Sequence, residues 1–183
     1  DTKALLEKAY IRKYGSLAGL DARMDAIYRA KPKGFDPGHY GRTKATKDPA
    51  RVVLAELFTG AECAPCVASD LAFDGLTERY GHDTLAVLVY HLHIPGPDPM
   101  TNTDTEARAK YYKVTATPTA VVDGLAPKSG GGGAAQAPNV FADYKGKVEA
   151  RVDKAPLATR KDFKAEVDDK SVKVTGQATL LSE

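Results

Sequence analysis

The two cysteines of the chain are separated by two residues, in the run Cys63-Ala64-Pro65-Cys66. Stabilisation by a disulfide grows with the length of the loop that it closes, so this pair is poorly placed to restrain an unfolded chain. Two intervening residues are typical of a redox-active dithiol or of a metal site. The alternative is a buried pair of inert thiols. The spacing therefore directs the search for function to the surroundings of this pair.

Composition excludes several other classes of protein. Of 183 residues, 43% are hydrophobic, as expected for a chain with a packed core. The formal net charge of +2 gives no reason to expect a nucleic-acid partner. The longest apolar run, Leu85 to Tyr90, is too short to span a membrane. No signal peptide is visible at the start, so we interpret the sequence as a trimmed or mature chain.

Pattern changes divide the chain into three predicted parts. Residues 1–48 read as a helical N-terminal extension, in which Leu20, Met24 and Ile27 belong to an amphipathic stripe. The run from Lys31 to Gly38 is typical of a linker. Residues 49–155 form an α/β domain. Residues 156–183 are predicted as a β hairpin, either packed on the preceding domain or beginning a β-sandwich.

The middle part alternates between strands and helices, with the first two strands expected to be parallel. A flexible, low-complexity break is expected at residues 130–133. The predicted strands are 52–58, 84–94 and 119–122, and the predicted helices run from Cys63 to Tyr80, from Thr103 to Tyr112 and from Asn139 to about Lys154.

This order of elements resembles the thioredoxin fold over residues 51–154. The resemblance rests on Cys63-Ala-Pro-Cys66 at a strand-to-helix junction, on the segment from Tyr111 to Thr119, and on the turn at Asp123-Gly124. It implies a three-layer α/β/α architecture with a mixed central sheet. Residues 57–63 also resemble the lead-in of secreted or periplasmic bacterial thioredoxin-like proteins. Glu62 stands where thioredoxins usually carry a tryptophan.

The chemistry of the cysteines follows from their expected place at a helix start. Unsatisfied N–H groups and the positive end of the helix dipole favour the thiolate, which is the attacking species. We therefore assign Cys63 as the nucleophile and the more exposed of the two. Cys66, three residues later, is assigned as the resolving thiol that leaves the disulfide oxidised. Pro65 is compatible with the first helical turn.

Two further site residues come from the resemblance. Pro118 is implied to be the family's cis-proline, which places Thr117 beside the sulfur atoms and lets its backbone pair with an extended substrate. The alternative is a trans proline at the start of a strand. Glu56 would match the family's buried carboxylate if one extra residue preceded Cys63, and a raised pKa would then make it a general base for Cys66. Equally, Glu56 is compatible with a strand-end carboxylate that reaches solvent or pairs with a lysine or arginine.

The segment from His91 to Asn102 departs from the thioredoxin pattern. His91 and His93 lie two apart in a predicted strand and so point to one side. Three interpretations stay open: structural hydrogen bonding, tuning of the Cys63 pKa, or a Cu(I) site with Cys63, Cys66 and a histidine. Asp98 and Asn102 are predicted to cap the following helix.

These observations together predict an extracytoplasmic thiol–disulfide oxidoreductase that needs no cofactor beyond its redox-active disulfide. Its expected partners are a thiol- or disulfide-bearing protein and an electron donor or acceptor. Proline before the second cysteine is what reducing members of the family carry, which favours a reductase. The alternatives are a copper-handling module on the same fold and a non-catalytic interaction domain of a larger secreted protein.

Overall fold

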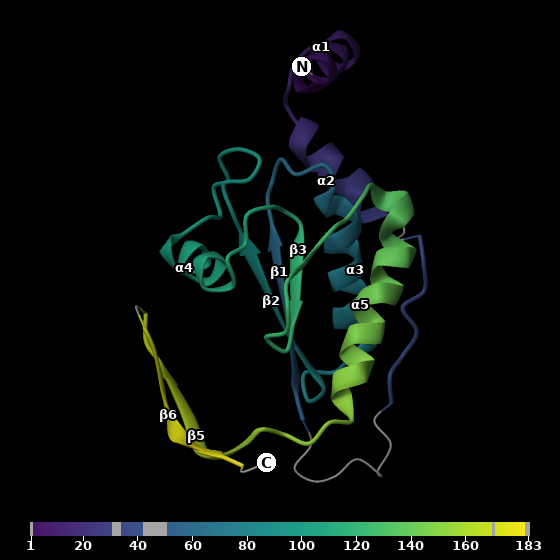
Figure 1. The fold of residues 1–183 in the computed structure, drawn as a ribbon. Helices are drawn as coiled ribbons and strands as arrows, with labels where there is room; N and C mark the ends of the chain where they lie inside the picture. Colours follow the sequence, from purple (N-terminus) through teal and green to yellow (C-terminus); the bar gives the residue numbers. More distant parts are fainter. Residues whose placement is uncertain (1, 31–33, 42–50, 170, 182–183) are drawn as a thin grey trace. The chain divides into compact units, whose positions relative to one another are not determined.

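The computed structural model describes residues 2–30, 34–41, 51–169 and 171–181 (Figure 1). The chain forms two compact units, residues 1–33 and residues 34–183. The boundary predicted between residues 48 and 49 falls outside the described ranges. Within those ranges, no helix has the length and apolar character needed to cross a membrane.

The first unit contains two helices, as the sequence predicted. They are α1 (Thr2–Tyr14) and α2 (Leu20–Ala30). Gly15 and Gly19 border the turn between them with φ values of 82° and 80°, a backbone region that favours glycine. Leu20 is buried, whereas Met24 and Ile27 of the predicted stripe are exposed.

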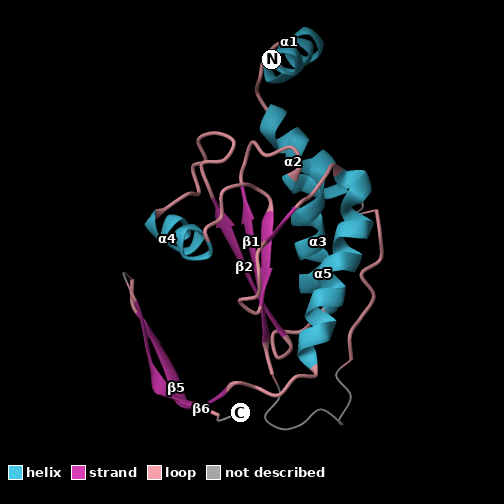
Figure 2. Cartoon of the chain, viewed as in Figure 1, coloured by secondary structure: helices cyan, strands magenta, loops and turns pink. Residues whose placement is uncertain are grey.

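The second unit is built on a four-stranded mixed sheet with the strand order β2-β1-β3-β4 (Figure 2). The two longer strands, β1 (Val53–Thr59) and β2 (Leu85–His91), are parallel, as predicted. β3 (Thr119–Val122) runs antiparallel to β1, and the short β4 (Lys128–Ser129) runs antiparallel to β3. The mixed α/β sheet expected from the sequence is therefore present.

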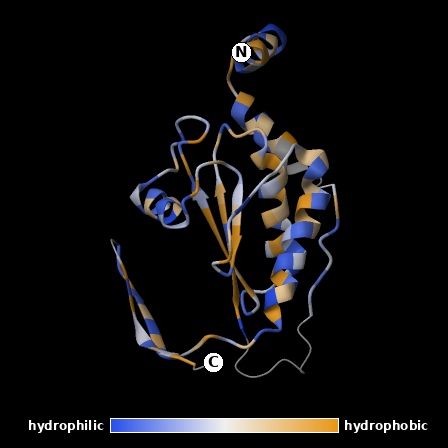
Figure 3. Cartoon of the chain, in the orientation of Figure 1, coloured by the Kyte–Doolittle hydropathy of each residue, from blue (hydrophilic) through white to orange (hydrophobic). Residues whose placement is uncertain are grey.

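Helices cover both faces of this sheet (Figure 1). The helices α3 (Cys66–Arg79) and α5 (Ala137–Val152) lie on one face, and α4 (Thr103–Tyr112) lies on the other. Side chains of β1 alternate between the faces. Leu57 belongs to the core shared with α3 and α5, and Phe58 belongs to a second core that includes Ala109 of α4. The central strands are mostly hydrophobic (Figure 3), because both of their faces are buried.

Two expectations for this unit need correction. The second strand ends at His91 and not at Ile94, because Ile94 N–H turns back to donate to the carbonyl of Leu92 at 2.7 Å. The segment read as a linker packs on the core over its described part, residues 34–38. Phe35 packs against Phe141 with ring centroids 4.8 Å apart. This segment therefore belongs to the second unit, while residues 31–33 lie outside the described ranges.

The predicted C-terminal hairpin is present. Its strands, β5 (Ala158–Val167) and β6 (Val172–Leu180), pair antiparallel, and the register shifts between Lys161 and Lys164. Most of the described side chains on both strands are exposed. Two strands alone are marginally stable, so the hairpin gains little from its own packing.

Candidate redox site

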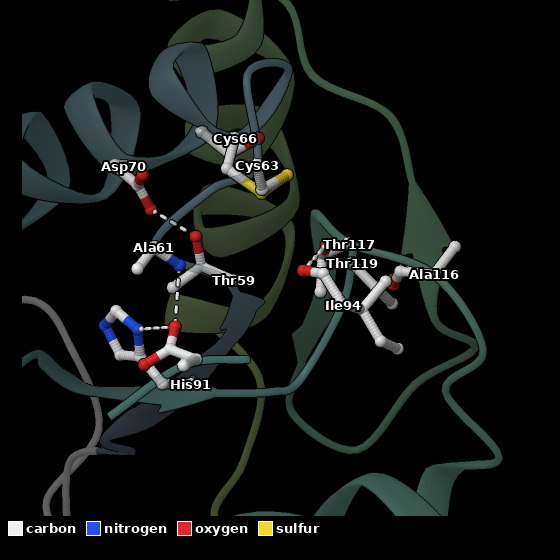
Figure 4. The surroundings of a disulfide bond; sticks show 12 residues. Thr59, Ala61, Cys63, Cys66, Asp70, His91, Ile94, Ala116, Thr117 and Thr119 are labelled. Carbon is white, nitrogen blue, oxygen red and sulfur yellow. Dashed lines mark hydrogen bonds and ion pairs between the residues drawn. A yellow bond between two sulfur atoms is a disulfide. The ribbon is translucent and has the colours of Figure 1, made fainter. Parts of the chain in front are cut away.

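The two cysteines form a disulfide at the junction between β1 and α3 (Figure 4). Cys63 is 6% exposed and Cys66 is 1% exposed, so the predicted order of exposure is confirmed. The helix begins later than expected: Cys66 is its first residue and Pro65 its N-cap. Cys63 lies in the preceding turn, and its carbonyl accepts the N–H of Cys66 at 2.9 Å.

The loop that leads into Cys63 is fixed by a buried carboxylate. Asp98 Oδ2 accepts the N–H of Ala61 at 2.6 Å and lies 2.8 Å from Nδ1 of His91 (Figure 4). Its other oxygen accepts the N–H of Met100. Burial alone would raise the pKa of Asp98, but the bonds from His91, Met100 and Ala61 outweigh it and lower the pKa. Asp98 thus joins the loop after β2 to the loop before the disulfide, a role that the sequence did not indicate.

Gly60 allows the two loops to approach closely. A Cβ atom at this position would lie 2.2 Å from the carbonyl oxygen of Ile94, so no side chain fits there. Gly60 also accepts the N–H of Cys63 through its carbonyl at 3.1 Å. The residue therefore sets the path of the chain into the nucleophile position.

Thr117 and Pro118 border the same region. The peptide bond between them is cis, as the resemblance predicted; the Ile94–Pro95 bond is cis as well. The Thr117 hydroxyl donates to the carbonyl of Ile94 at 3.0 Å (Figure 4). Thr117 is therefore tied to the loop that also contacts Gly60.

The glycine run after β4 is an ordered part of the site, which corrects the expectation of a flexible break. Gly132 N–H donates to the carbonyl of Pro65 at 2.7 Å, and Gly130 N–H donates to the carbonyl of Pro118 at 3.2 Å. A Cβ atom on Gly131 would lie 2.1 Å from the carbonyl oxygen of Pro65 and 2.6 Å from Cγ of Pro118. The cysteine segment and the cis-proline therefore meet across Gly131.

Glu56 lies away from the disulfide, on the side of the sheet that faces α4. It is fully buried, and Arg108 binds both of its oxygens at 2.7 and 3.0 Å. Tyr112 and Tyr90 donate to it as well. Burial by itself raises the pKa of Glu56, but these bonds more than offset it and lower the pKa. The expected raised pKa is wrong, and the interpretation as a carboxylate paired with an arginine is confirmed.

Asp70 is a site residue that the sequence interpretation missed. It lies in α3 four residues after Cys66, and its Oδ1 accepts the hydroxyl of Thr59 at 2.9 Å (Figure 4). Burial raises the pKa of Asp70 in spite of the bond from Thr59. The available signal was the four-residue spacing from a cysteine within a predicted helix, which puts both side chains on one face.

Both histidines of the segment from His91 to Asn102 bind Asp98. His91 contacts its carboxylate, and Nδ1 of His93 accepts its N–H at 2.9 Å. The structure thus shows the hydrogen bonding of the first interpretation. Asn102 caps α4 as predicted, but Asp98 does not. Within the described ranges, no group of three or more histidine, cysteine, aspartate or glutamate residues is arranged so that it could hold a metal ion.

Comparisons with known proteins do not assign a family to the chain. No protein-family model matches it, and no curated protein matches it. What is established is a mixed α/β sheet that carries a CxxC-spaced disulfide at a strand-to-helix junction.

Proposed function

We propose that the protein is a thiol–disulfide oxidoreductase of the thioredoxin-like class. The observation that carries the proposal is the disulfide between Cys63 and Cys66 at the start of α3, next to the cis-proline segment. A disulfide stabilises a fold more when it closes a longer loop, and this bridge spans a sequence separation of only 3. The strand order and the helices on both sheet faces support the thioredoxin-like class.

The reaction is an exchange of one disulfide for another. In the reduced protein, the Cys63 thiolate attacks one sulfur of a substrate disulfide, and the other substrate sulfur leaves as a thiolate. Cys66 then loses its proton and attacks the Cys63 sulfur, which releases the second substrate thiolate. The protein is oxidised to the disulfide, and the substrate gains two electrons and two protons. No further cofactor enters this sequence of steps.

Direction and location are part of the same proposal. Pro65 before the second cysteine favours a reductase, and the resemblance of residues 57–63 favours a periplasmic or extracellular site. A protein disulfide is the expected substrate, and a separate dithiol donor must return the electrons.

The reduction potential tests the proposal most directly. We expect equilibration against glutathione, with trapping of free thiols, to give a value near thioredoxin's ~−270 mV. The Cys66→Ser variant should accumulate mixed disulfides through Cys63. The matched Cys63→Ser variant should trap far less, because Cys66 is almost fully buried.

Two other results are informative. A value near ~−120 mV would keep the exchange chemistry but make the protein an oxidant. A bridge that resists reduction to below roughly −300 mV, with no trapping by Cys66→Ser, would show that the disulfide is structural. The hypothesis of a non-catalytic interaction domain would then replace the hypothesis of an enzyme.

A further inference from the structure

Opening the disulfide creates a buried thiol that must lose its proton. Cys66 is 1% exposed, so water has little access to it. Only the thiolate of Cys66 can attack the mixed disulfide on Cys63, and burial in itself disfavours that thiolate. A base near Cys66 would remove this obstacle.

Two buried carboxylates, Glu56 of β1 and Asp98 in the loop after β2, are already engaged by strong partners. Glu56 is paired with Arg108 on the α4 side of the sheet. Asp98 is held by His91 and by two backbone N–H groups. Proton uptake by either one would break a buried network, which is costly.

Asp70 differs from both in its partners. Its hydrogen-bond partner is the neutral hydroxyl of Thr59, and in the described ranges no lysine or arginine forms an ion pair with it. The titratable groups that influence it electrostatically are Asp74 on α3, His91 on β2 and Tyr144 on α5. Burial makes the largest contribution to its pKa and raises it. The carboxylate of Asp70 can therefore take up a proton without losing an ion pair.

The position of Asp70 matches that chemistry. Residues four apart in a helix are neighbours on one face, so Asp70 lies one turn beyond Cys66 along α3. Thr59, which holds the carboxylate, is the last residue of β1 and directly precedes the loop to Cys63 (Figure 4). The carboxylate is thereby fixed between the helix and the strand end that frame the disulfide.

We propose that Asp70 accepts the proton of the Cys66 thiol, directly or through one water molecule, when Cys66 resolves the mixed disulfide. This inference rests on the proposed function. The S–H bond of Cys66 breaks and an O–H bond forms on Asp70, while the freed electron pair makes the Cys63–Cys66 bond. The bond between Cys63 and the substrate sulfur breaks, and the departing thiolate takes a proton back from Asp70 or from solvent. Thr59 is a positioning residue in this step.

Oxidised glutathione is a suitable probe, because attack of the Cys63 thiolate on it releases one glutathione thiolate and leaves the other glutathione bound to Cys63 for Cys66 to displace. Reduced protein is mixed with the probe, quenched with acid at intervals, and the glutathionylated form is followed by mass spectrometry. We expect Asp70→Asn to resolve this form about 100-fold more slowly than the wild type near neutral pH. The difference should shrink as the pH is raised, because hydroxide ion then removes the proton of Cys66 without help from Asp70.

Asp74→Asn is the matched control, since it removes the same charge from the same helix at an exposed position. It removes a charge that raises the pKa of Asp70, so it should shift the pH profile only slightly to lower pH and should leave the rate of resolution near neutral pH unchanged. Thr59→Val keeps the carboxylate of Asp70 but removes the hydrogen bond that lowers its pKa. The fall in the rate of resolution on the acid side of the pH profile should therefore begin at a higher pH. This second variant tests the inference even if Asp70→Asn does not fold.

The outcomes separate the two proposals. If the wild type resolves the mixed disulfide and Asp70→Asn gives the same pH profile as Asp74→Asn, the role of Asp70 is wrong and the exchange activity stands. If reduced wild-type protein forms no mixed disulfide at all, the proposed function fails, and the inference fails with it.

Discussion

A side chain at position 131 would collide with both segments that border the disulfide. A Cβ atom there would lie 2.1 Å from the carbonyl oxygen of Pro65, and a backbone atom has little freedom to move away. We expect Gly131→Ala to lower the free energy of unfolding by about 1–3 kcal/mol. It should also slow the attack of Cys63 on a disulfide, because the cysteine segment and Pro118 are forced apart.

Gly133→Ala is the control for this substitution. It lies in the same run, but its Cβ would meet only a side-chain atom of Gln136 at 3.5 Å. Urea unfolding and the rate of mixed-disulfide formation should be near wild type for this variant. Equal effects of the two substitutions would mean that the contact with Pro65 and Pro118 does not shape the site.

At the scale of elements, the ion pair between Arg108 and Glu56 ties α4 to the centre of the sheet. Glu56 is fully buried, so Arg108→Ala leaves a charge without its main partner. We expect the free energy of unfolding to fall by about 3 kcal/mol. Lys110→Ala, an exposed change on the same helix, should cost little.

The same pair gives the stability a pH dependence with a definite sign. The folded pKa of Glu56 lies below its ordinary value of 4.5, so its contribution is fully present above about pH 4.5 and is lost as the pH falls through the folded pKa. In Arg108→Ala, burial is expected to raise the pKa of Glu56, so this carboxyl group is neutral at acid pH. The difference in stability between Arg108→Ala and the wild type should therefore be smallest at acid pH. Urea unfolding across pH checks this. Adding Glu56→Gln to Arg108→Ala removes the unpaired charge and should restore part of the lost stability. If the double variant is no more stable than Arg108→Ala alone, the explanation is wrong.

The sequence predicted the elements well because hydrophobic periodicity and start and stop signals are local. The third strand and the helix 103–112 match their predicted bounds, the other predicted elements of the sheet domain shift by a few residues, and β4 was not predicted. Pairings across the chain were not predictable in this way. Nothing in the local pattern indicates that Asp98 binds Ala61, or that Gly131 separates Pro65 from Pro118. The glycine run at residues 130–133 resembles a flexible segment when only the sequence is considered. Its glycines are explained by the close approach of the Gly131 backbone to the backbone of Pro65.

The candidate site shows the same difference between local patterns, which were predictable, and contacts between distant segments, which were not. Cys63 and Cys66 were found by spacing and Pro118 by resemblance, whereas Asp70 was overlooked. The proton-accepting role was expected of Glu56, because Glu56 is the charged residue within a buried strand. The face on which a strand residue lies depends on the register of the whole sheet, and that register places Glu56 toward α4.

At the scale of the whole molecule, the two compact units predict where the chain can be shortened. The second unit starts at Gly34, and its first described segment supplies aromatic side chains to the core. Phe35 packs on Phe141, and Tyr40 packs on Tyr80 at 5.0 Å. The chain 34–183 should therefore unfold at the same urea concentration as the full chain and keep its rate of disulfide exchange.

Starting the chain at residue 42 instead should be harmful. It removes Phe35 and Tyr40, together with the bond from Tyr40 N–H to the carbonyl of Arg79 at 3.0 Å. Because both rings are partly buried against the core, we expect a loss of about 2–4 kcal/mol in the free energy of unfolding. Urea unfolding of the two shortened chains beside the full one decides the matter. If removing residues 1–33 costs as much as removing residues 1–41, the helices α1 and α2 support the second unit, and the division into two units does not describe its stability.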